Sequence, residues 1–149
     1  MQDANYKMMK TNKQLIGIDL FAGAGGLSLG AEMAGISMRY AVEADAYAAA
    51  SYKRNFKNAT VFCEDIRKLS ADKLNTQPVF IIMGGPPCQG FSLSNTKTRD
   101  MSNPNNRMFE EFLRFVDKIA PTWFVFENVY GLTKFKNGEE NIQNHIENR

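Results

Sequence analysis

With 149 residues, the chain is long enough to bury a hydrophobic core but too short for two ordinary domains. Apolar residues make up 44% of it, as in a typical globular protein, and no apolar run approaches the roughly 20 residues that a transmembrane helix needs. The 18 basic and 16 acidic residues leave a net charge of +2, which is too small to argue for a polyanionic partner.

The first 13 residues form a polar tail that lacks the apolar segment of a signal peptide, so we expect a cytoplasmic protein of the prokaryotic cytosol or nucleoid. The chain has only two cysteines, Cys63 and Cys88, too few for a secreted disulfide scaffold of this size. Neither has zinc-ligand spacing, and the only histidine is His145, so we predict no metal site. We expect Cys63 to be a small buried side chain, whereas Cys88 is either a buried thiol or a nucleophile.

Short apolar runs alternate along the chain with helical patterns. We predict strands at residues 15–21, 38–43, 60–63, 79–83 and 123–126. We predict helices at residues 27–34, 46–56 and 109–119, and a partial helix from Asn137 onward. The fourth and fifth runs are apolar on both faces, as in covered parallel strands, which places Trp123 in the core. Strands that alternate with helices predict a parallel α/β sheet.

Local signals fix two helix ends. Gly35 occupies the position after the first helix where glycine favours termination, and Asp45 can cap the second helix. The one long irregular segment, residues 84–106, exceeds the usual loop length of a compact domain. Loops of that length usually carry function or are disordered.

In an open parallel sheet, ligands bind beyond the carboxyl ends of the strands. A glycine-rich turn, residues 19–26, follows the first strand, although Ser28 replaces the last glycine of a full dinucleotide-binding fingerprint. Glu43, 20 residues beyond Gly23, follows the second strand, where an acid can accept hydrogen bonds from ribose hydroxyls. Asp65 follows the third strand, where it can accept from an adenine amino group. Singly, each is more often a tight turn or a surface carboxylate; together they predict a pocket for a nucleoside-bearing cofactor.

Cys88 follows the fourth strand and Glu127 follows the fifth, so the expected strand order puts both on one rim. The stiff Pro86–Pro87 pair fixes where the thiol points. A thiol and a carboxylic acid that face one cofactor cleft form a catalytic constellation, so we favour a nucleophile over a buried thiol.

The motifs DLFAGAGG (19–26), GGPPCQGFS (84–92) and FENV (126–129) resemble those of the C5-cytosine DNA methyltransferases in order and spacing. The resemblance extends over residues 15–131. It implies the class I S-adenosylmethionine-dependent methyltransferase fold, a Rossmann-like doubly wound parallel sheet, with about five of its seven strands present. The implied cofactor is S-adenosylmethionine, the product is S-adenosylhomocysteine, and the implied partner is double-stranded DNA.

The resemblance also assigns residues. The implied cofactor-binding residues are Phe21, Gly23, Gly25, Gly26, Leu27, Glu43, Ala44, Asp65, Ile66 and Pro86. The implied catalytic residues are Cys88, Glu127 and Asn128. The implied DNA contacts are Gln89, Ser92, Ser94, Lys97, Arg99 and Arg107.

Each assignment carries an expected role. Glu43 would hold the ribose and Asp65 the adenine, while Ala44 is smaller than the apolar residue of many relatives, so we expect weaker stacking there. Cys88 would attack C6 of a flipped cytosine, and Glu127 would bind N3 and the exocyclic amine. Asn128 would orient the cysteine loop.

We expect residues 14–149 to be the N-terminal part of a catalytic domain without its target-recognition domain and returning C-terminal helix. The last strand would then be an exposed apolar edge. Three explanations remain: a fragment, which we favour, one subunit of a split enzyme, or strands supplied by another copy. A DNA methyltransferase of a restriction-modification system is the first hypothesis, inactive as this chain alone; an RNA methyltransferase is a related version. The alternative is a non-catalytic S-adenosylmethionine-binding subunit or regulatory module.

Overall fold

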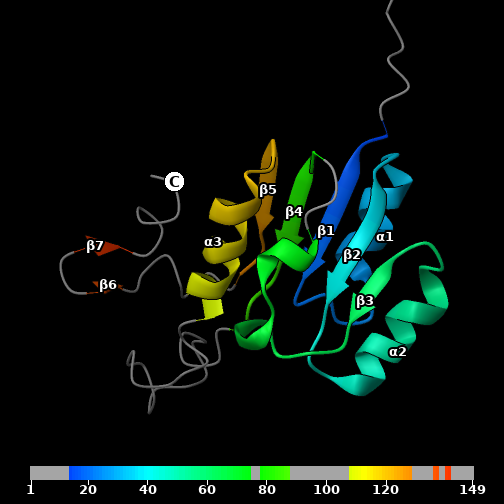
Figure 1. Ribbon diagram of the computed structural model, residues 1–149, viewed down its shortest axis with the longest axis horizontal. Coiled ribbons are helices and arrows are strands. Elements are labelled where there is room, and N and C mark those ends of the chain that lie inside the picture. Colours follow the sequence, from blue (N-terminus) through cyan, green and yellow to red (C-terminus); the bar gives the residue numbers. More distant parts are fainter. Residues whose placement is uncertain (1–13, 75–77, 88–107, 129–135, 138–139, 142–149) are drawn as a thin grey trace, which may run out of the picture.

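The computed structural model describes residues 14–74, 78–87, 108–128, 136–137 and 140–141. Parallel strands form a five-stranded sheet in the order β3-β2-β1-β4-β5 (Figure 1). These strands are β1 (Ile16–Leu20), β2 (Ser37–Val42), β3 (Thr60–Phe62), β4 (Ile81–Gly84) and β5 (Trp123–Phe126). The helices are α1 (Gly26–Met33), α2 (Ala46–Asn55) and α3 (Met108–Ile119), joined by the 3-10 turns η1 (Ile66–Lys68) and η2 (Ala71–Leu74). The predicted parallel α/β sheet is confirmed.

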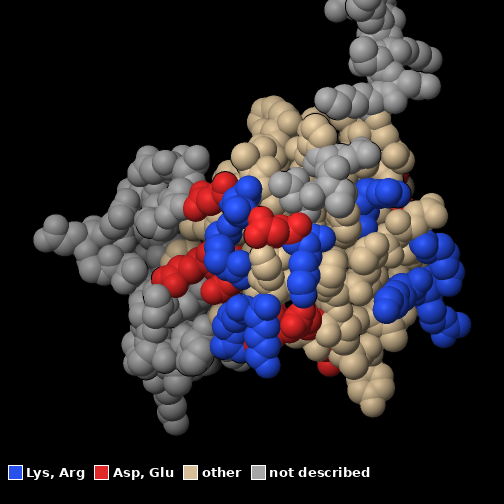
Figure 2. Space-filling view, viewed as in Figure 1, with Lys and Arg blue, Asp and Glu red and all other residues tan. Residues whose placement is uncertain are grey.

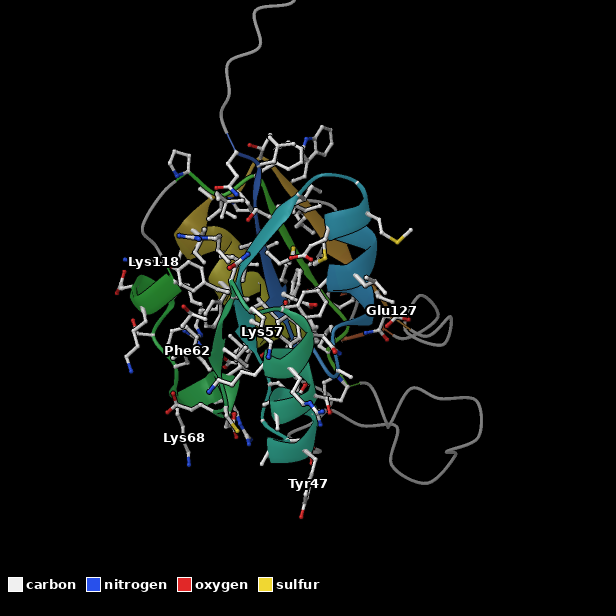
Figure 3. All side chains as sticks on the ribbon, turned by 90° about the vertical axis from the view of Figure 1, so that its right-hand side faces the viewer. Tyr47, Lys57, Phe62, Lys68, Lys118 and Glu127 are labelled. Atoms are coloured by element: carbon white, nitrogen blue, oxygen red, sulfur yellow. The ribbon has the colours of Figure 1, made fainter. Side chains whose placement is uncertain are left out.

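The sheet is covered on both faces, and the side chains of its central strands point to one face or the other. Ile18 and Leu20 belong to the large core cluster that α3 and the two 3-10 turns complete. Met38 and Met83 lie on the opposite face, where they cluster with Ala31 of α1. Figure 3 views the sheet edge-on, with α3 and α1 on opposite sides of it.

The strand order reverses direction at the centre of the sheet. The chain moves outward from β1 through β2 to β3 and then returns to the other side of β1 with β4. Ligands of doubly wound folds bind outside the carboxyl ends of the strands at such a switch point. Here that point lies between β1 and β4, whose last residues Leu20 and Gly84 are register partners.

The predicted helix ends are confirmed in atomic detail. Asp45 accepts hydrogen bonds at its carboxylate from the amides of Tyr47 and Ala48, at 3.0 and 2.8 Å, which satisfies the first turn of α2. Gly35 has a φ of 83°, and its N–H donates to the carbonyl of Glu32 at 2.9 Å. This left-handed residue ends α1 as glycine commonly does.

The expectation that β5 is buried on both faces, with Trp123 in the core, is wrong. Trp123 is 63% exposed and Val125 is 43% exposed, whereas Phe124 and Phe126 pack edge-on against Phe112 of α3. Trp123 and Val125 lie beside Ile81 and Met83 of β4, which are buried with Ala31 of α1. Strand β5 lies one strand further from α1. No described helix covers β5 on that face, so the apolar run has only one buried side.

Two smaller expectations are also wrong. Cys63 is exposed, because the outermost strand β3 ends at Phe62 and the thiol lies beyond the sheet. At the start of the partial helix that we predicted from Asn137 onward, the described residues instead form the antiparallel pair β6 (Lys136–Asn137) and β7 (Glu140–Asn141), and the rest of that prediction lies outside the described residues.

Charges of both signs are interspersed on the face that carries α3 and the 3-10 turns (Figure 2). Lys118 of α3 pairs there with Asp72 of η2 at 3.2 Å, and Arg67 pairs with Asp65. Within the described ranges, none of the helices has the length and apolar character needed to cross a membrane.

The first prediction concerns the seam between β1 and β4, by which we mean the close backbone contact of Gly84 with Leu20. A Cβ atom at Gly84 would lie 2.2 Å from the carbonyl oxygen of Leu20, so Gly84→Ala must push the two central strands apart. We expect a loss of about 1–3 kcal/mol or more in the free energy of unfolding, measured by urea titration. Gly30→Ala is the matched control, because the added Cβ on α1 would have no atom within 4 Å apart from its chain neighbours and the nearby backbone of its own helix. The control is expected to be neutral or stabilising by up to about 1 kcal/mol. Equal stabilities of the two variants would contradict this account of the seam.

Candidate active site

The chain leaves β1 through a tight turn, residues 21–25, that needs unusual backbone angles. Phe21 and Gly25 have φ values of 60° and 100°. A left-handed residue other than glycine costs about 1–3 kcal/mol, so the surroundings must hold Phe21 in place. A Cβ at Gly25 would lie 2.3 Å from the ring of Phe56, so only glycine fits there.

Glu43, the residue after β2, ties this turn to the start of α2. One carboxylate oxygen accepts from the amide of Gly23 at 2.8 Å, and the other accepts from the amide of Asp45 at 2.7 Å. A carboxylate oxygen has a second lone pair, so each can still accept a hydrogen bond from a ligand hydroxyl. The structure thus places the predicted ribose-binding acid directly beside the glycine-rich turn.

Asp65, the predicted adenine acceptor, is held by its neighbour Arg67. Its carboxylate accepts from the backbone amide of Arg67 at 3.0 Å and from the guanidinium of the same residue. These bonds lower the pKa of Asp65 to about 2, so the carboxylate remains ionised and acts only as an acceptor. Arg67 was not predicted from the sequence, although its position two residues after the acid is a signal for such a pair.

These elements enclose a cavity of about 370 Å³ at the carboxyl ends of the strands. Its lining contains five of the predicted cofactor-binding residues: Phe21, Glu43, Ala44, Asp65 and Ile66. The residues that were not predicted are Val42, Glu64, Arg67, Gly85, Pro87 and Met108. Met108 begins α3, far along the chain, and no local pattern marked it. The predicted residues outside the lining are Gly23, Gly25, Gly26, Leu27 and Pro86.

The ends of β4 and β5 form the rim next to this cavity. The amide of Glu127 donates to the carbonyl of Gly84 at 2.9 Å. A Cβ at Gly85 would lie 2.6 Å from Oε2 of Glu127, so the glycine leaves the space that the carboxylate occupies. Asn128 donates from Nδ2 to the carbonyl of Pro86 at 3.3 Å. The predicted acid and amide therefore lie against the backbone that leads toward position 88.

The remaining predicted residues lie outside the described part of the chain. They are Cys88, Gln89, Ser92, Ser94, Lys97, Arg99 and Arg107.

A buried polar group lies beneath the turn on the α1 and α2 side of the sheet. Asp19 is 1% exposed, and its Oδ2 accepts from the hydroxyl of Ser28 at 2.6 Å. Burial raises the pKa of Asp19 to about 6, and the hydrogen bonds from Ser28 only partly oppose that shift. Glu43 raises the pKa further by its charge.

An open parallel sheet with a glycine-rich turn and an acid-lined cavity at its switch point defines a nucleotide-cofactor-binding α/β fold. The family model for C-5 cytosine-specific DNA methylases matches residues 15–148. This chain therefore belongs to the C-5 cytosine-specific DNA methylase family. Its fold is the Rossmann-like fold of S-adenosylmethionine-dependent methyltransferases, as the sequence motifs predicted.

Individual relatives agree with this assignment. The chain is 46% identical over 121 residues to the type II methyltransferase M.DdeI of Desulfomicrobium norvegicum, a match that covers 80% of this chain and 29% of that protein. A structure assigned to a prophage-encoded DNA modification methyltransferase (E. coli) superposes with a TM-score of 0.73 and 38% identity, over 91% of this chain and 37% of that one. A DNMT2 variant of Spodoptera frugiperda, at 23% identity, shares the fold with a TM-score of 0.66 over 91% of this chain and 40% of that one. The chain thus spans well under half of these relatives.

The buried acid generates the second prediction. A carboxyl with a pKa of about 6 in the folded protein and 3.8 in the unfolded chain binds its proton more tightly when folded. Its contribution to stability is therefore present at about pH 4 and is lost as the pH rises through about 6, a change of about 3 kcal/mol. Urea unfolding between pH 4 and 7 should show this decline in the wild-type protein and not in Asp19→Asn. A parallel decline in both proteins would contradict the assignment.

Proposed function

We propose that this chain is the cofactor-binding and base-activating part of a DNA (cytosine-5) methyltransferase. The observation that carries the proposal is the contact of the Glu127–Asn128 pair with Gly85 and Pro86, next to the acid-lined cavity. Cys88 follows this segment directly in the sequence, and we propose that its thiol acts beside the carboxyl group of Glu127. A thiol nucleophile and an acid at one cleft are the groups that addition to a pyrimidine ring requires.

The cavity suits S-adenosylmethionine in its hydrogen-bond acceptors and in its size. The carboxylates of Glu43 and Asp65 are acceptors for ribose hydroxyls and for an adenine amino group, while Phe21, Ile66 and Met108 offer apolar surface to the purine ring. Its volume of about 370 Å³ lies within the roughly 300–1,000 Å³ of small-molecule sites. The bound cofactor would supply the methyl group.

In the proposed mechanism, the thiolate of Cys88 forms a bond to C6 of cytosine, and the electrons of the C5–C6 double bond move toward C5 and the ring. Glu127 binds N3 and the exocyclic amine, which stabilises charge that develops at N3. After C5 has received the methyl group, a base removes the C5 proton. The double bond forms again and the thiolate leaves as the free enzyme.

The substrate in this proposal is double-stranded DNA. A cytosine inside a duplex cannot reach the rim, so it must be flipped out of the stack. The polar stretch of sequence that follows Cys88 is the segment that we propose contacts the DNA, with Lys97, Arg99 and Arg107 as the candidate phosphate contacts.

We further propose that activity needs a part of the enzyme that this chain does not contain. The chain spans 29% of M.DdeI, a type II methyltransferase, and that name supports a role in restriction and modification of DNA. The remaining part is supplied either in the same polypeptide or by a second chain. We expect little or no methylation by the 149-residue chain alone, so robust methylation of duplex DNA by that chain would contradict this point.

The cofactor site is tested by Glu43→Gln. An amide has only one oxygen, so either Gly23 or Asp45 loses the acceptor of its N–H, and the turn shifts. We expect S-adenosylmethionine to bind at least about tenfold more weakly, as measured by equilibrium dialysis. Asp72→Asn is the control, because Asp72 pairs with Lys118 away from the cavity and should leave affinity unchanged. Unchanged affinity in Glu43→Gln would contradict the proposed site.

The reaction is tested by trapping the enzyme on DNA in which every cytosine is 5-fluorocytosine, because the target sequence is then included. Fluorine at C5 leaves no proton to remove, so a catalytic cysteine remains attached after methyl transfer. With the remaining part of the enzyme and S-adenosylmethionine present, we expect a denaturation-resistant complex on gels. Cys88→Ala should abolish this complex and Cys63→Ala should retain it.

Two further outcomes bear on the alternative function. A complex that forms equally in Cys88→Ala would show that another residue is the nucleophile. If the cofactor binds but no complex forms, the chain is better described as a non-catalytic S-adenosylmethionine-binding module.

A further inference from the structure

A buried chain of hydrogen bonds links three elements beneath the glycine-rich turn. Tyr52 of α2 lies 2.6 Å from Ser28 of α1, hydroxyl to hydroxyl, and Ser28 donates to Asp19 of β1 at 2.6 Å. Tyr52 and Ser28 are both 0% exposed. Polar groups buried to this degree affect stability strongly, because any member that loses its partner remains shielded from water.

The proton positions in this chain follow from the count of donors. A serine hydroxyl has one proton, and Ser28 gives it to Oδ2 of Asp19. When Asp19 is ionised, Tyr52 must then donate to the Ser28 oxygen, so the hydrogen bonds are directed toward the carboxylate. The other oxygen, Oδ1 of Asp19, is buried with no hydrogen-bond partner in the described part of the molecule. The charged groups that act on this chain are Glu43, which acts on Asp19, and Glu32, which acts on Tyr52.

The three hydrogen-bonded side chains contact the turn from both of its ends. Asp19 lies two residues before Phe21, and Ser28 lies in the first turn of α1, just after Gly25. The ring of Tyr52 closes the same space from a third direction, since a Cβ at Gly25 would lie 3.0 Å from one of its ring carbons. The turn includes Phe21 in a left-handed conformation, which persists only where surrounding contacts determine it.

We infer that the Tyr52–Ser28–Asp19 chain is a positioning network that holds residues 21–25 in the geometry that binds the cofactor. Tyr52 and Ser28 are positioning residues that act through the turn and need not touch the ligand. Core packing alone does not require two hydroxyls and a carboxylate here, because apolar side chains of similar size would fill the space without desolvating an acid. The part of this inference that concerns cofactor binding rests on the proposed cofactor site.

The test compares Ser28→Ala with Ser51→Ala, which removes a hydroxyl on exposed α2 that bonds only the carbonyl of Tyr47. The structural readout is amide hydrogen exchange by NMR at Gly23 and Gly25 in the turn, relative to Ile82 in the core. For Ser28→Ala we expect exchange in the turn to accelerate at least about tenfold more than exchange in the core. Ser51→Ala should change neither.

A second pair of variants keeps the test valid if Ser28→Ala does not fold. Tyr52→Phe keeps the bond between Ser28 and Asp19 and removes one hydroxyl, and Tyr47→Phe is its control at an 87% exposed position. We expect Tyr52→Phe to loosen the turn and weaken S-adenosylmethionine binding by several-fold, with the control unchanged. In the wild type the exchange ratio of turn to core should change between pH 5 and 7, whereas Asp19→Asn should show no such change.

The outcomes separate the network from the proposed function. Equal acceleration at turn and core in both Ser28→Ala and Tyr52→Phe, or no acceleration in either, would overturn the network and leave the cofactor site standing. If the turn loosens selectively but the wild-type chain, with the remaining part of the enzyme supplied, does not bind S-adenosylmethionine even at millimolar concentration, the network stands and the cofactor proposal fails.

Discussion

The carboxylate of Glu43 is the interaction on which the candidate site depends, because it joins two turns that face the same cavity. It accepts hydrogen bonds from Gly23 in the turn after β1 and from Asp45 at the start of α2. Asp45 in turn caps α2, whose Tyr52 reaches back to Ser28 beneath the first turn. A displacement of this carboxylate would therefore move both the turn that contains Phe21 and the segment that contains Ala44, two residues that line the cavity. The positions of these lining residues are thus coupled through Glu43.

The features that the sequence could predict are those set by local pattern. Apolar runs marked the strands, Gly35 and Asp45 marked helix ends, and alternation of strand and helix implied that the strand ends would share one edge. That implication placed Glu43 and Asp65 at the cavity before any contact was known. It also placed Glu127 at the rim of β4, because parallel strands present their carboxyl ends together.

What could not be predicted depends on contacts between distant segments. Ser28 interrupted a glycine fingerprint, but only the fold reveals its hydroxyl between Asp19 and Tyr52, which is 24 positions away. Trp123 is another case, because a run of four apolar residues does not say how many faces of its strand are covered. Met108 lines the cavity because α3 begins there, and no hydrophobic period or motif around this residue pointed toward a ligand.

The spacing of the two central strands connects the proposed cofactor part of the site to the part that we propose meets the base. The turn after β1 and the Gly85–Pro86 segment after β4 leave adjacent strands, which lie only about 4.8 Å apart in a sheet. Gly84 permits this closeness, because any side chain there would meet the carbonyl of Leu20. Gly85 then leaves room for the carboxylate of Glu127 on the other side. The two glycines thus bring the cavity and the Glu127 carboxylate close together. The proposed transfer of a methyl group between two bound molecules would require this closeness, because the reacting atoms must meet within about 3–3.5 Å.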